Sequence, residues 1–85
     1  MTTFASNDEF FAALRKLIEA WCDRRCLWAL HCILGGYLAF DGLTDGWARL
    51  RDGLRNVRAY ARDELTDDER GTVDDLIRAS REAMR

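Results

Sequence analysis

The side chains with the clearest metal-binding chemistry lie close together in the first half of the chain. Cys22, Cys26, His31 and Cys32 could each donate a ligand to zinc or to a metal cluster. Their spacing argues against this, because zinc ribbons and fingers hold ligands in pairs around tight turns, whereas these residues lie in apolar, helix-favouring sequence. We therefore predict no metal site and no cofactor, and we interpret the cysteines as small buried apolar side chains.

A basic pair offers the next possible chemistry. Arg25 and His31 are separated by five residues, a spacing that resembles the Arg-x5-His motif of the all-helical HEPN ribonucleases. This resemblance implies cleavage of a phosphodiester with Arg25 and His31 as the catalytic pair. It extends over these two residues only, and with twelve arginines in 85 positions an arginine at this distance before a histidine is a common coincidence. We predict that the protein is not an enzyme, and we interpret His31 as a core or near-core residue.

A stripe of arginines is the most coherent polar feature. Arg51, Arg55, Arg58 and Arg62 are spaced by four, three and four residues, so they share one side of a helix. Asp52 could pair with Arg55, but most of the stripe has no acid at the favourable position on its own helix. Three interpretations remain open: pairing within the molecule to Asp67–Glu69 or to Asp74 and Asp75, docking of an acidic partner protein, or contact with nucleic-acid phosphates.

Helices are the elements that must position these residues. Proline is absent and helix-favouring residues dominate. Capping boxes are predicted at Ser6–Glu9 and Thr66–Glu69, and a turn at Asp41–Thr44. We predict an all-α protein, a small antiparallel bundle of about four helices over 7–22, 25–40, 44–64 and 67–84, forming a single domain of residues 1–85. The alternative is one long helix over 7–40 in a helical dimer, because Asp23–Arg25 contains no Gly or Pro.

The apolar faces of these helices follow helical spacing. The first stripe joins Phe10, Leu14, Leu17 and Trp21, with Phe11, Ile18 and Cys22 beside it, the second runs from Leu43 and Trp47 through Leu50, Leu54, Val57 and Ala61 to Leu65, and the last consists of Val73, Leu76, Ile77 and Met84.

Residues 26–40, CLWALHCILGGYLAF, are apolar apart from His31. Fifteen helical residues reach about 22 Å, too short for a hydrocarbon core of about 30 Å, so we predict no membrane span. Three other helices cannot easily cover the whole segment, which favours a homodimer or a partner as its cover. Gly35-Gly36 indicates a close helix approach, either within the protomer or at such an interface.

The net charge of −2, from thirteen basic and fifteen acidic residues, provides no general attraction to nucleic acid. An odd number of cysteines and the absence of a signal-like N-terminus favour the cytoplasm. We predict a non-enzymatic protein–protein interaction module, such as an adaptor, an immunity or antitoxin-like protein, or a phage-type inhibitor. Its predicted contact residues are the four arginines of the stripe together with Trp28, Tyr37 and Trp47. A nucleic-acid-binding module is the first alternative, and a HEPN-like ribonuclease or Cys/His metal protein the second.

Overall fold

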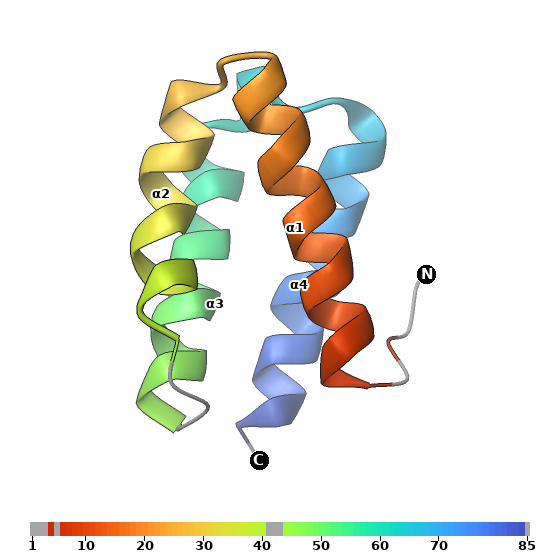
Figure 1. The fold of residues 1–85 in the computed structure, drawn as a ribbon, viewed down its shortest axis with the longest axis vertical. Helices are drawn as coiled ribbons and strands as arrows, with labels where there is room; N and C mark the ends of the chain where they lie inside the picture. Colours follow the sequence, from red (N-terminus) through yellow and green to blue (C-terminus); the bar gives the residue numbers. More distant parts are fainter. Residues whose placement is uncertain (1–3, 5, 41–43, 85) are drawn as a thin grey trace.

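The protein is an all-α bundle in the computed structural model, which describes residue 4, residues 6–40 and residues 44–84. Its elements are α1 (Asn7–Asp23), α2 (Leu27–Leu38), α3 (Thr44–Tyr60), the 3-10 turn η1 (Arg62–Glu64) and α4 (Asp67–Ala83). Successive helices run in opposite directions, and α1 and α3 each pack beside both α2 and α4 (Figure 1). The predicted fold class is confirmed. Of the turn predicted at Asp41–Thr44, residues 41–43 lie outside the described residues, and Thr44 is the first residue of α3.

A backbone motif separates α1 from α2. Arg25 adopts a left-handed conformation with φ of 56°. The N–H of Arg25 donates to the carbonyl of Cys22, and the N–H of Cys26 donates to that of Trp21, which is the hydrogen-bond pattern of a Schellman helix end. The alternative of one continuous helix over 7–40 is therefore wrong. The left-handed position holds arginine, where glycine is usual, so no glycine marked this helix end in the sequence.

The start of α2 is capped from a distant part of the chain. Cys26 occupies the N-cap position, and its side chain makes no capping bond. Glu64 supplies the bond instead, because its carboxylate accepts from the N–H of Ala29 at 2.9 Å and its carbonyl accepts from the Cys26 thiol at 3.6 Å. This contact requires η1, so α3 ends at Tyr60 and not near residue 64 as predicted.

The core lies between all four helices. Its buried residues in the first half of the chain are Phe10, Leu14, Leu17, Ile18, Trp21, Cys26, Ala29 and Ile33. Those from α3 onward are Trp47, Leu50, Leu54, Val57, Ala61, Leu65, Val73 and Leu76. The predicted stripes of α1, α3 and α4 supply most of these residues. In α2 the outer side chains remain uncovered: Leu27, Trp28 and Leu38 are 69%, 64% and 75% exposed. No helix in the described part of the chain is long and apolar enough to cross a bilayer.

Two glycines allow α2 and α3 to approach closely. A Cβ on Gly53 would lie 2.8 Å from the carbonyl oxygen of Cys32, and one on Gly36 would lie 3.0 Å from that of Arg49. A Cβ on Gly35 would meet nothing within 4 Å. The close approach indicated by Gly35-Gly36 is thus made by Gly36 within the protomer, and Gly53 makes the tighter contact.

An ion pair joins the α1 end to the start of α4. The guanidinium of Arg24 donates to both carboxylate oxygens of Glu69, at 2.9 and 2.6 Å, and to the carbonyl of Glu64 at 3.2 Å. Glu69 also completes the capping box with Thr66, as predicted. Burial alone would raise the pKa of Glu69, but the hydrogen bonds from Arg24 and Thr66 outweigh it, so the pKa lies below its ordinary value.

This shift predicts a loss of stability in acid. The folded-state pKa of Glu69 lies below the unfolded one, so its contribution is present above about pH 4.3 and is lost as the pH falls through the folded pKa. We expect wild type to be more resistant to urea than Glu69→Gln at neutral pH, and this advantage to shrink progressively as the pH falls below about 4.3. Urea denaturation followed by circular dichroism at neutral pH and across this acidic range measures it. A difference between the two proteins that is independent of pH would contradict the assignment.

Candidate functional site

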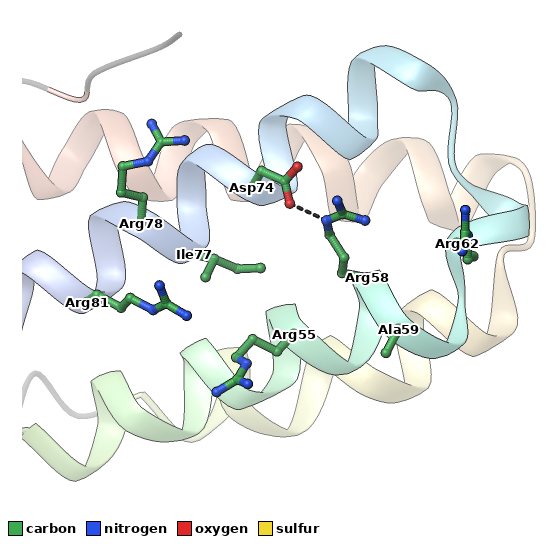
Figure 2. Close-up of a pocket in the computed structure, with 8 residues that line it drawn as sticks. All are labelled: Arg55, Arg58, Ala59, Arg62, Asp74, Ile77, Arg78 and Arg81. Carbon is green, nitrogen blue, oxygen red and sulfur yellow. Dashed lines mark hydrogen bonds and ion pairs between the residues drawn. The ribbon is translucent and has the colours of Figure 1, made fainter.

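Five arginines line a groove between α3 and α4. The groove has a volume of about 550 Å³ and is lined by Arg55, Arg58, Ala59, Arg62, Asp74, Ile77, Arg78 and Arg81. Figure 2 shows the side chain of Arg81 extending from α4 into the space beside Ile77, and the side chain of Arg55 lying along α3 on the other side of that space. Arg55 and Arg58 of α3 and Arg62 of η1 thus form one wall, and arginines of α4 form the other.

The charge of this groove is strongly positive. Five arginines against one aspartate give its lining a formal charge of +4, in a chain whose total is −2. Arg58 donates to Asp74 across the groove, and Arg78 pairs with Asp75 at 3.5 Å along α4. Within the described part of the chain, Arg55, Arg62 and Arg81 have no such ion pair. These three guanidinium groups can donate to a bound anion.

The intramolecular interpretation of the stripe is correct for one of its members. Arg58 pairs with Asp74. The acidic first turn of α4 has other partners, since Asp67 pairs with Arg70 and Glu69 with Arg24. Asp52, which could have paired with Arg55, binds Arg51 at 3.2 Å instead. Arg51 is not part of the groove lining.

The three aromatic contact residues predicted from the sequence lie in different environments. Trp28 is 64% exposed on α2, with its ring edge-to-face against His31 at 6.2 Å. Tyr37 is half-buried beside Phe11. Trp47 is only 6% exposed, and its ring lies 5.2 Å from Phe10 and 4.8 Å from Phe40. The structure therefore places Trp47 in the core and leaves Trp28 as the accessible ring.

The three cysteines and His31 also differ in their exposure to solvent. Cys26 is buried as expected, but Cys22 is exposed and Cys32 is half-buried, so the prediction of three buried thiols is wrong for Cys22, which falls outside the apolar face of α1. His31 is exposed and not a core residue, because it lies on the outer side of α2. In the residues that the structure describes, no three His, Cys, Asp or Glu side chains are grouped to hold a metal ion.

Sequence reasoning missed part of the groove and one accessible ring. Arg78 and Arg81, which were not among the predicted contact residues, form the second wall. Their spacing of three residues was a usable signal, since it places both on one side of α4. Tyr60, which is 74% exposed at the end of α3, was also missed.

No protein-family model, curated protein or solved structure matches the chain.

The arrangement suits recognition of an extended anion. Guanidinium groups donate paired hydrogen bonds to carboxylates and phosphates, and several in a row act on a ligand with several charges. Ala59 and Ile77 add apolar surface to the lining. The lining therefore offers charged hydrogen-bond donors and apolar surface side by side.

Proposed function

We propose that this protein is a non-enzymatic interaction module that binds an acidic segment of another protein in the groove between α3 and α4. The observation that carries the proposal is the concentration of five arginines and a single aspartate around one hollow in a chain with net charge −2. Such a local excess of positive charge attracts an acidic ligand to one place on the surface. The acidic residues elsewhere have the same sign of charge as the ligand and do not attract it.

The apolar part of the lining favours a protein ligand. Ile77 and Ala59 lie among the arginines, and an aliphatic side chain of a peptide can pack there while its acidic neighbours reach the guanidinium groups. A module of this type acts by occupying or stabilising the partner's acidic segment. The roles of adaptor, immunity or antitoxin-like protein and phage-type inhibitor are all compatible with that action.

The test is a titration with defined probes. A fluorescein-labelled oligoglutamate peptide is titrated with wild type and with the triple variant Arg55→Glu, Arg62→Glu, Arg81→Glu. We expect Kd to rise at least about tenfold in the variant, because three favourable charge pairs become repulsive. The control reverses Arg15, Lys16 and Arg49, which are exposed and lie outside the groove lining. Equal loss of binding in both variants would show a general effect of net charge and would contradict binding of the peptide in the groove.

A nucleic-acid-binding module is the second candidate, favoured by the exposed rings of Trp28 and Tyr60 near the arginines, because bases stack on such rings. The same titration with a single-stranded oligonucleotide and a duplex distinguishes it. Tighter binding of either than of the peptide, with a steep dependence on salt, would replace the protein-binding proposal.

Self-association is a further proposal, based on Leu27, Trp28 and Leu38, which leave apolar surface on the outer side of α2. The sequence of α2 contains no Asp, Glu, Lys or Arg, so two copies would meet without charge repulsion. Light scattering measures the mass in solution, and a mass of 9.8 kDa at every concentration would contradict a homodimer.

A further inference from the structure

A second hollow lies on the other flank of α3, between it and α2. It has a volume of about 320 Å³ and is lined by Trp28, His31, Cys32, Asn56 and Tyr60. Trp28 and Tyr60 are 64% and 74% exposed, so both rings are accessible from solvent. Large aromatic side chains that are open to solvent beside a hollow are typical of contact sites.

The two hollows are connected across the outer face of α3. A depression of about 470 Å³ between them is lined by Asp52, Arg55, Asn56, Ala59 and Tyr60. It shares Arg55 and Ala59 with the arginine groove, and Asn56 and Tyr60 with the aromatic hollow. Ala59 is exposed. Because its side chain is short, a ligand that crosses α3 there can lie close to the helix backbone. One ligand can therefore contact both flanks.

The charge changes along this path. The lining of the arginine groove has a formal charge of +4. The lining of the depression contains one aspartate and one arginine, so its formal charge is zero. The lining of the aromatic hollow contains no Asp, Glu, Lys or Arg. A complementary ligand is acidic at one end, uncharged in the middle and bulky and apolar at the other. A nucleic-acid strand carries a phosphate at every nucleotide, so its middle would place phosphates over a depression whose lining has no net charge. A peptide avoids this by placing neutral residues there.

We infer that the acidic segment crosses α3 over Ala59 and inserts an aromatic side chain between Trp28 and Tyr60. This inference rests on the proposed function and specifies its ligand. An α-helix is about 10 Å across and an extended chain advances about 3.3 Å per residue, so the acidic run and the aromatic residue are separated by roughly three or four residues.

Synthetic peptides test the spacing and the anchor. The first carries four glutamates, a Ser-Gly-Ser spacer and phenylalanine. The second replaces the phenylalanine with alanine, and the third places the phenylalanine directly after the glutamates. Each is labelled with fluorescein and titrated with wild type, Trp28→Ala, Tyr60→Ala and the groove variant that reverses Arg55, Arg62 and Arg81. Leu38→Ala is the matched control, since Leu38 is a 75% exposed apolar residue of α2 outside the hollow.

The first peptide is expected to bind wild type about tenfold more tightly than the other two, because burial of one aromatic ring and its contacts with two others supplies a difference of this size. Trp28→Ala and Tyr60→Ala should each reduce that advantage, and Leu38→Ala should leave it unchanged. The groove variant should weaken all three peptides.

Equal binding of the three peptides to wild type would overturn the crossing while leaving the acidic-segment proposal intact. Failure of all three to bind would overturn both. A single-stranded oligothymidylate that binds more tightly than the first peptide, and loses affinity in Trp28→Ala, would assign the connected surface to nucleic acid and overturn the inference.

Discussion

Gly53→Ala is expected to lower the free energy of unfolding by about 2 to 3 kcal/mol, even though alanine is the better helix former. The new Cβ would lie 2.8 Å from the carbonyl oxygen of Cys32. That oxygen belongs to the backbone of α2, so relief of the overlap requires the two helices to move apart and loosens the core around Ile33, whose side chain would lie 3.5 Å from the same Cβ.

Two other glycines provide the controls for this prediction. Gly35 and Gly71 are helical, and a Cβ at either position would meet nothing within 4 Å. Alanine there should raise the free energy of unfolding by about 0.5 to 1 kcal/mol through the lower flexibility of the unfolded chain. Urea denaturation monitored by circular dichroism measures all three variants. A stabilised Gly53→Ala would show that α2 and α3 are farther apart than described.

The second large effect separates two tryptophans that the sequence grouped together. Trp47→Ala is expected to cost about 3 to 5 kcal/mol, because it empties a buried site surrounded by aromatic rings. The ring centroids of Phe10, Phe11 and Phe40 lie 5.2, 5.8 and 4.8 Å from that of Trp47. A domain of this size has roughly 4 to 13 kcal/mol in total, so much of its stability would be lost.

Trp28→Ala is the matched variant, since it removes the same side chain from an exposed position. Its stability should stay within about 0.5 kcal/mol of wild type. The two unfolding curves, recorded under the same conditions, measure the contrast. Similar losses in both variants would mean that Trp28 is covered in solution, and a small loss in Trp47→Ala would place that ring outside the core. The contrast also matters for binding experiments, because only Trp28→Ala preserves the fold.

One wall of the groove could be predicted from the sequence, and the other could not. The spacing of Arg51, Arg55, Arg58 and Arg62 identified a stripe on one side of the third helix, and three of these residues line the groove. The second wall could not be derived from that helix. Helical spacing tells which residues of one helix share a side, but the neighbour of that side depends on how the helices are arranged and rotated in the bundle.

By itself, the sequence determined the all-α class and most of the buried positions, because helical propensity, capping residues and apolar spacing act over a few neighbouring residues. It also determined the capping box at Thr66, which the structure contains. These features depend on contacts within a single turn or on one face of one helix.

Only the tertiary structure decided the contacts between distant segments. Glu64 caps α2 across 35 residues of sequence, Arg24 pairs with Glu69 across 45, and Arg78 and Arg81 face the arginines of α3. Trp47 and Trp28 have the same side chain, but one points into the bundle and the other away from it. The physical reason is that these outcomes depend on the packing of helix against helix, which no local pattern encodes.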